Sequence, residues 1–582
     1  MPSVIVRPAA VFRAVAISLL CHMTFVTPPA ATVSWGVLPV SAGEAPDRIE
    51  ATRRELHRLR SELARERWEA LVQARPERRV ELFAAHDTLL SSATLDSIRT
   101  ARGATADSGE GRRLELLELD LARHAMLAGV ARQDDEIARL MSRLEADVED
   151  YPRPLTLREL DHWIALDPDS LRIRMLESVR LGLWRDRLDP LFENRRMTID
   201  SLAIAFGYDG YAEFSARLRR GDPGLVLAQL FGLVRATDTM YQLLTRELGR
   251  PPQANPPGRR SPVPAVTTRE LVRLEWTEEF DRYVDAAPAL ARAVLDTVWG
   301  GPYPPGCPAP VVTTVKPPLS REGLTPRILS TGEIPAEVAA IDPPVDVRVV
   351  VADLTGVAAA RAALLVAGQA RESCGAPESL TEEFRAGDDL AGLAAGYLQA
   401  GLVSTPEWYE ARRRLDRANG RDSDVARLSD VNLARLIRWR LWCDLKWIRT
   451  ELASGLLTEL MRHRAGTDLW MPYVFVPTGS GEREIIRQIR GFARGGSMTQ
   501  AEAYDTLRPG PDFLLVMDEA RGLALAATIE ERLRGELGPE WFTNPAGRHP
   551  SVVPTGATDF EPLRRRFDRL FDWSERELEG VR

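Results

Sequence analysis

The side chains of this sequence that are best able to do chemistry are the carboxylates after residue 371. Glu372, Glu378, Glu382 and Glu383 are close enough in sequence to offer oxygen ligands to a calcium ion or to share a proton. A solvated helix face explains the same residues, because charged side chains at helical spacing usually point to water. We favour the solvated face over a site.

Histidines are the next candidates, as zinc ligands. Two histidines four positions apart lie on one helix face and can bind the same zinc ion. No such pair occurs among the histidines beyond residue 42, which are His57, His86, His124, His162, His463 and His549. The sequence therefore predicts no metal site built from a histidine pair.

Cysteines beyond residue 42 are Cys307, Cys374 and Cys443. Their odd number and wide spacing exclude a disulfide framework, although one bridge could form in an oxidising compartment. We favour buried thiols that pack as small apolar groups.

One tryptophan-rich segment also invites a binding interpretation. Aromatic rings beside cations are typical of sites for anionic or stacking partners. The spacing of these tryptophans spreads them over more than one helix face, so we favour core packing. The residues are Trp439, Trp442 and Trp447, with Arg438, Arg440 and Lys446 between and beside them.

The segment from Pro344 to Ala370 has the clearest element order in the chain. Val345 to Val351 is a β-branched run that predicts a strand, and Gly356 predicts a turn. An alanine-rich helix is expected to follow. The segment thus predicts a strand, a turn and a helix in succession.

This order resembles the zinc peptidases of the thimet oligopeptidase and oligopeptidase F group, in which a strand and a turn precede a helix carrying HExGH. Aligned on ALLVAGQA, the two histidine positions hold Leu365 and Gln369, and the glutamate position holds Val366. Gly368 matches the glycine of the motif. The resemblance implies a zinc-peptidase scaffold without its metal-binding side chains.

The third ligand of that group is a glutamate in a following helix, in a pattern close to ExPSxxxE. The best match begins at Gly375, with Pro377 and Glu382 in agreement and Glu378 between them. Gly375 has no side chain that could bind a metal. The resemblance therefore implies that this ligand is also missing.

Two further segments resemble the same group. FGYDGYAEF, ending at Phe214, is similar to a tyrosine-rich segment upstream of the motif, and Pro509 to Gly547 is similar to the closing helices. Where working members have tyrosines that polarise the substrate carbonyl, this chain has Phe513, Leu514 and Met517. The resemblance implies a channel lined by Leu365, Val366, Gln369, Glu378, Glu382, Phe513 and Met517.

The first 42 residues have the pattern of a signal peptide. Arg7 and Arg13 precede an apolar run, Ala14 to Val26, that is too short to span a bilayer comfortably. We expect cleavage between Thr32 and Gly43 and a periplasmic or secreted protein. No later stretch is apolar enough for a membrane span.

Composition supports a folded chain with no nucleic-acid partner. The chain has 582 residues, 44% of them hydrophobic, and a formal net charge of -8, which lacks the positive surface that phosphate binding requires. The predicted class is mainly α, a large helical scaffold with one small β-sheet near 345–351 and a central channel. The expected regions are a signal peptide (1–42), an N-terminal helical cap (43–196) and a peptidase-like helical domain (197–582).

These features lead to a functional hypothesis with two alternatives. The hypothesis is an exported, non-catalytic pseudo-peptidase that binds peptides or a protein partner and needs no cofactor. One alternative is an active zinc metallopeptidase with relocated ligands, which alone would require zinc. The other is a purely structural helical protein.

Overall fold

The computed structural model describes residues 45–73, 75–149, 151–166, 169–248, 278–295, 308–315, 336–375, 390–462, 514–544 and 558–580. The chain divides into two units, Met1–Arg48 and Ile49–Arg582. Of the first unit, only the start of α1 is described. The predicted signal segment, together with Glu378, Glu382 and Phe513, lies outside the described residues.

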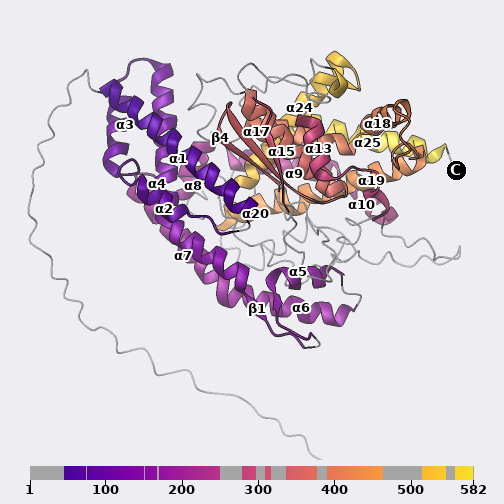
Figure 1. Ribbon diagram of the computed structural model, residues 1–582, viewed down its shortest axis with the longest axis horizontal. Coiled ribbons are helices and arrows are strands. Elements are labelled where there is room, and N and C mark those ends of the chain that lie inside the picture. Colours follow the sequence, from indigo (N-terminus) through magenta and orange to yellow (C-terminus); the bar gives the residue numbers. More distant parts are fainter. Residues whose placement is uncertain are drawn as a thin grey trace, which may run out of the picture. The chain divides into compact units, whose positions relative to one another are not determined.

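The described chain is mainly helical, as predicted (Figure 1). In its first third, Thr156 and Glu159 form reciprocal hydrogen bonds of 3.2 and 3.0 Å that cap the start of one helix. Another helix begins where Asp107 accepts a hydrogen bond from the backbone N–H of Gly109. The helices of this part are α1 (Ala45–Gln73), α2 (Arg79–Ala85), α3 (Ser92–Ala104), α4 (Ser108–Arg143), α5 (Leu157–Leu166), α6 (Ser170–Leu183) and α7 (Asp189–Ala205).

The predicted tyrosine-rich segment forms the turn between α7 and α8 (Tyr211–Arg219). Gly207 and Gly210 have φ angles of 88° and 135°, which residues with a β-carbon rarely adopt. Asp200 accepts a hydrogen bond from the backbone N–H of Tyr211 at 2.9 Å. These features end α7 and start α8 in a new direction.

The remaining helices follow in sequence and form most of the core. They are α9 (Pro223–Ala236), α10 (Asp238–Leu248), α12 (Glu278–Asp281), α13 (Ala287–Leu295), α15 (Val357–Gly375), α17 (Leu390–Ala400), α18 (Pro406–Ala418), α19 (Asp430–Trp447), α20 (Ser454–Arg462), α24 (Leu515–Leu537) and α25 (Glu561–Glu579). Short helical turns occur at η1 (Trp184–Leu188), η3 (Gly401–Ser404), η4 (Ile448–Ala453) and η5 (Trp541–Thr543).

The predicted strand is present as β5 (Asp346–Ala352), the centre of a three-stranded sheet. It pairs antiparallel with β4 (Ala336–Asp342) and parallel with β3 (Val311–Val315). We predicted one sheet, but a two-residue pair, β1 (Glu145–Ala146) with β2 (Leu155–Thr156), also forms. Strand β3 was not predicted from the sequence, although the β-branched VVTTV between prolines fits an edge strand.

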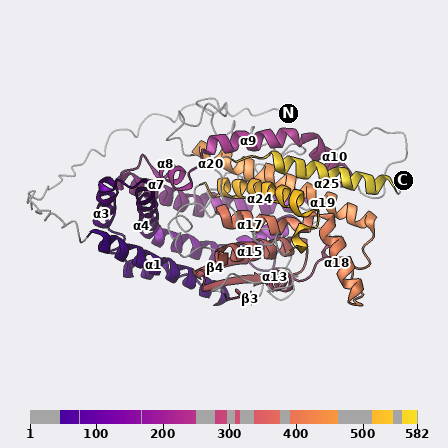
Figure 2. The ribbon, with the colours of Figure 1, turned by 90° about the horizontal axis from the view of Figure 1, so that it is seen from above.

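The sheet and the central helices are stacked in layers. The sheet contacts α15, α15 contacts α17, α17 contacts α24, and α24 contacts α9. Figure 2 shows this succession from the sheet to α9. The layers place α15, the helix with the positions aligned to the zinc motif, in the interior between the sheet and α17.

Candidate functional site

Helix α15 carries the aligned positions of the zinc motif, and its start is fixed from elsewhere in the chain. Asp281, the last residue of α12, accepts a hydrogen bond from the backbone N–H of Val357 at 3.1 Å. Gly356 has a φ of 110°, and a β-carbon there would lie 2.7 Å from the same carboxylate. The turn therefore needs glycine, and it holds α15 against the sheet.

The two positions aligned with histidines lie on one face of α15 and meet α17. A β-carbon added to Gly396 would lie 3.0 Å from Leu365 Cδ1 and 3.0 Å from Gln369 Cγ. Leu365 and Gln369 are each half-buried there. The structure thus brings these two predicted residues together, but against a glycine of α17 that sequence alignment did not single out.

A second glycine makes the contact reciprocal. A β-carbon added to Gly368 would lie 2.4 Å from the carbonyl oxygen of Ala395 and 2.8 Å from Gly396 Cα. The backbones of α15 and α17 are therefore in direct contact, which only glycine permits. This contact fills the place where the resemblance implies a channel floor.

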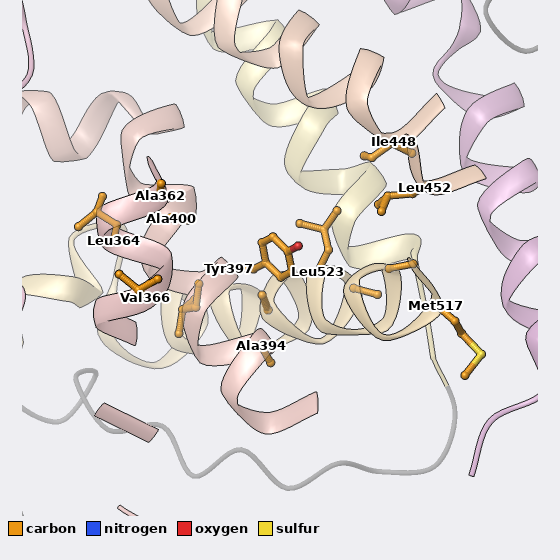
Figure 3. Packing of buried hydrophobic residues seen from close by; sticks show 14 of the residues in the cluster. Ala362, Leu364, Val366, Ala394, Tyr397, Ala400, Ile448, Leu452, Met517 and Leu523 are labelled. Carbon is orange, nitrogen blue, oxygen red and sulfur yellow. The ribbon is translucent and has the colours of Figure 1, made fainter. Parts of the chain in front are cut away.

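Val366, in the glutamate position, is buried in the main apolar core with 2% of its surface exposed. Figure 3 shows it on α15 beside Leu364, with Ala394 and Tyr397 on the neighbouring helix. A zinc site needs donor atoms and space for a water molecule at the metal. Leu365, Val366 and the Gly368–Ala395 contact offer neither, so the residues present do not fit a zinc ion.

Gly375 does not occupy the place that the alignment gave it. We placed it in a helix after α15, but it is the last residue of α15 itself, six positions beyond Gln369. At the helical rise that separation is about 9 Å along the axis. The helix that packs beside Leu365 and Gln369 is α17, so the third position was assigned wrongly.

Met517 is fully buried in the first turn of α24. Its Cε atom would lie 3.2 Å from a β-carbon on Gly221, so it packs under the turn between α8 and α9. Leu514, with a φ of 67°, precedes it, and its backbone N–H donates to Glu459 at 3.1 Å. Met517 therefore fixes the start of α24.

A charged pocket lies one helical turn before Leu365. Arg361 lines it from α15, Tyr397 and Ala400 from α17, and Asp444 and Trp447 from α19. The other lining residues come from η3, α24 and α25 and are Gly401, Ser404, Leu523, Leu563, Arg566 and Phe567. Sequence reasoning missed this pocket, although the arginine- and tryptophan-rich segment around Trp447 was one signal of it.

Asp444 organises the polar side of the pocket. Its Oδ1 atom lies 3.2 Å from Arg361 Nη1 and accepts a hydrogen bond from Arg440 Nη2 at 2.9 Å. Ser404 donates to Oδ2 at 3.3 Å. Burial opposes ionisation of Asp444, but the charges of Arg361, Arg440 and Arg566 outweigh it, so the pKa of Asp444 stays below its usual value. Asp444 is therefore ionised at neutral pH.

Two groups near Arg361 favour their neutral forms. Burial, with the charges of Glu451 and Asp518, raises the pKa of Glu519 to about 7, and Arg361 offsets only part of this. Burial also raises the pKa of Tyr397 well above its usual value. Tyr397 therefore keeps its proton and remains a hydrogen-bond donor.

The structure also tests the predictions for the tryptophan-rich segment and for the cysteines. Trp439 and Trp442 are core residues with at most 3% exposure, and the Trp447 ring lies 5.7 Å from that of Tyr397. Treating all three late cysteines as thiols is wrong for Cys374, which is disulfide-bonded, whereas Cys443 is a buried free thiol. Sequence separation alone could not show that Cys374 has a partner.

The metal-binding and membrane-spanning capacity of the described residues, and the similarity of the chain to known proteins, bear on its identity. Within the part of the chain that the structure describes, no three His, Cys, Asp or Glu side chains gather in a way that could hold a metal ion. Among the same residues, no helix combines the length and apolar character needed to cross a bilayer. No protein-family model matches the sequence, and the search of characterised proteins finds no match.

Proposed function

We propose that this chain is an exported, non-catalytic protein on an oligopeptidase-type scaffold that binds peptides or a protein partner. The order of β5, the Gly356 turn and α15 supports the resemblance, because that group of peptidases has the same order. The peptide or protein partner follows from the resemblance and would use surfaces other than the filled contact of α15 with α17.

The observation that carries the proposal is the contact between Gly368 and Ala395. Hydrolysis by a zinc peptidase needs a metal-bound water and a stabilised oxyanion, both in a solvent-accessible cleft. Here the backbone of α17 lies against the aligned positions, and Leu365 fills the space between the helices. Restoring ligand side chains alone would not create the room that a metal and a substrate need.

Peptide turnover is the direct test. The purified mature protein is incubated with a quenched fluorescent peptide library, with added zinc and with a chelator in parallel, and peptide binding is measured by anisotropy. We expect binding without chelator-sensitive turnover, and less than stoichiometric zinc by elemental analysis. Chelator-sensitive cleavage would show instead that the ligands are relocated, and absence of both binding and turnover would favour a structural role.

Export is tested separately. A disulfide such as that of Cys374 persists in oxidising compartments, which agrees with a periplasmic or secreted protein. Mass spectrometry of the periplasmic and culture fractions should find a mature N-terminus between Thr32 and Gly43. An intact Met1 on protein confined to the cytosol contradicts export without bearing on catalysis.

A further inference from the structure

The pocket beside Arg361 carries more positive than negative charge on its walls. Its lining has two guanidinium groups, Arg361 and Arg566, and one carboxylate, Asp444. The side chains of Arg361 and Arg566 are only 13% and 6% exposed. Because buried charges interact strongly at low dielectric, this imbalance favours an anionic guest.

The carboxylates nearest to these arginines are shared among several cations. Asp444 faces Arg440 as well as Arg361. Glu530, 3.3 Å from Arg566 Nε, also lies 2.9 Å from Arg569 and 3.9 Å from Arg534. Asp444 and Glu530 therefore each divide their negative charge among several cations, and neither neutralises a lining arginine alone.

Tyr397 is an independent sign of a guest. It lines the pocket, and only 6% of its surface is exposed. Its hydroxyl makes no hydrogen bond to a described residue. A hydroxyl on the wall of a pocket that has no partner in the protein usually meets a bound molecule. Figure 3 shows Tyr397 with Leu523, which also lines the pocket, and the figure draws its oxygen at the free end of the ring.

We infer that this pocket binds one small inorganic anion of the size of chloride, held by Arg361, Arg566 and the hydroxyl of Tyr397. The pocket has space for about one water-sized guest, which limits the guest to a monatomic anion or one of similar size. Guanidinium and phenol groups are donors toward such a guest, and an anion accepts from all of them at once. The inference does not depend on whether the chain is catalytic.

Chloride is preferred to water for a physical reason. Asp444, the acceptor in the lining, already faces the guanidinium groups of Arg361 and Arg440 and accepts from the Ser404 hydroxyl. A water molecule would gain little by donating a hydrogen bond to Asp444. Chloride carries a negative charge and therefore interacts favourably with both lining arginines, Arg361 and Arg566. The Arg361–Asp444 pair also links α15 to α19, so the anion would stabilise the contact between these helices.

The test measures stabilisation by chloride at constant ionic strength. The full mature protein is prepared in sodium gluconate, whose anion is too large for the pocket, and is titrated with sodium chloride while thermal unfolding is followed. A guest that binds only the folded state adds RT ln(1 + [L]/Kd) to the free energy of unfolding, so the midpoint hardly changes below Kd and rises with the logarithm of the chloride concentration above it. We expect a curve of this form, whose bend gives the dissociation constant for chloride, rather than a rise that is linear in chloride concentration. Formate replaces chloride in a parallel arm to distinguish a halide from a carboxylate.

Variants assign the response to the pocket. Arg361→Gln should abolish the chloride-dependent rise. Tyr397→Phe, which keeps the ring, should raise the dissociation constant for chloride about tenfold by loss of one charge-assisted hydrogen bond. Arg427→Gln removes an exposed arginine outside the pocket and should leave the response unchanged. The phenylalanine variant keeps the test decisive if Arg361→Gln does not fold.

Crystals grown in sodium bromide give the direct observation. An anomalous peak between Arg361 and Arg566 supports the inference. A water molecule at that place with no bromide, an equal chloride response in the wild type and Tyr397→Phe, or stabilisation by formate but not by chloride each overturns it.

Discussion

A methyl group on Gly368 would lie 2.4 Å from the carbonyl oxygen of Ala395 on the facing helix. This distance is well inside van der Waals contact, and both atoms belong to rigid helix backbones. The contact therefore sets how closely α15 and α17 approach each other, and through them the shape of the core.

Replacing Gly368 with alanine should force the two helices apart. We expect Gly368→Ala to lower the free energy of unfolding by about 1–3 kcal/mol, the usual range for overpacking a core. The matched control is Gly232→Ala in α9, where a β-carbon meets nothing within 4 Å. That change should raise stability by about 0.5–1 kcal/mol through helix propensity. Urea denaturation measures both; an unaffected Gly368→Ala protein contradicts the close contact.

Asp444→Asn tests the charge arrangement of the pocket. The substitution leaves Arg361 and Arg440 facing a neutral amide in a buried place, which should cost about 3–5 kcal/mol. Asp422→Asn is the control, because its pair with Arg427 is 62–80% exposed and should contribute less than about 1 kcal/mol. Equal effects of the two variants in thermal denaturation would show that Asp444 does not balance buried charge.

Sequence patterns predicted elements more reliably than contacts. The strand expected at Val345–Val351 is β5 (Asp346–Ala352), because a β-branched run is a local signal. Strand β3 was not predicted, because the prolines on both sides of it favour irregular structure. The pocket could not be predicted, since Arg361, Tyr397, Asp444 and Arg566 come from four helices and have no shared spacing.

The surroundings of the positions aligned to the zinc motif were predicted only in part, for a related reason. Leu365 and Gln369 share a face of α15 because residues four apart always do in a helix. Tertiary packing decides which helix faces them. The short match at Gly375 predicted the helix after α15 that starts there, but Gly375 ends α15 and the facing helix is α17. The glycines Gly368 and Gly396 carried the relevant signal, but glycine in a helix has meaning only once its neighbour is known.

Glu66 should show an acid-dependent contribution to stability. Hydrogen bonds from Arg75, and to a smaller extent from Arg78, lower the pKa of Glu66 to about 2. Burial of the carboxylate opposes this shift. Its oxygens accept from Arg78 N at 2.8 Å and from Arg75 Nη2 at 3.0 Å, which fixes the chain after α1. Because the folded pKa lies below the usual 4.5, the stabilisation is present above that pH and is lost as the pH falls toward 2.

We therefore expect Glu66→Gln to cost about 1–3 kcal/mol at neutral pH and progressively less below pH 4.5. The control is Glu50→Gln in the same helix, where the carboxylate is 59% exposed and contacts Arg53 at 3.2 Å. It should change stability by less than about 1 kcal/mol. Denaturant titrations of the three proteins across this pH range measure the differences, and a pH-independent cost for Glu66→Gln is the contrary result.

Glu519 should show the opposite pH dependence. Burial and the carboxylates of Glu451 and Asp518 raise its pKa to about 7, with Arg361 opposing them, and Tyr397 is the other titratable group near it. Since the folded pKa exceeds the usual 4.5, the folded chain binds more protons between these values. Compared with a variant that has a non-ionising side chain at position 519, the protein keeps its full stability below pH 4.5 and loses stability as the pH rises through about 7.

Glu519→Gln removes the ionisation while keeping the shape of the side chain. It should leave stability nearly unchanged at pH 4.5 and raise it by about 1–3 kcal/mol above pH 7. Glu531→Gln, also in α24, is the matched control: hydrogen bonds from Arg565 lower the pKa of Glu531, so its loss should be slightly destabilising at high pH. Unfolding free energies of both variants and the wild type, measured at several pH values, separate the two signs. A Glu519→Gln protein that gains nothing above pH 7 would mean that Glu519 is ionised there at no cost and that the charges around Arg361 are balanced differently.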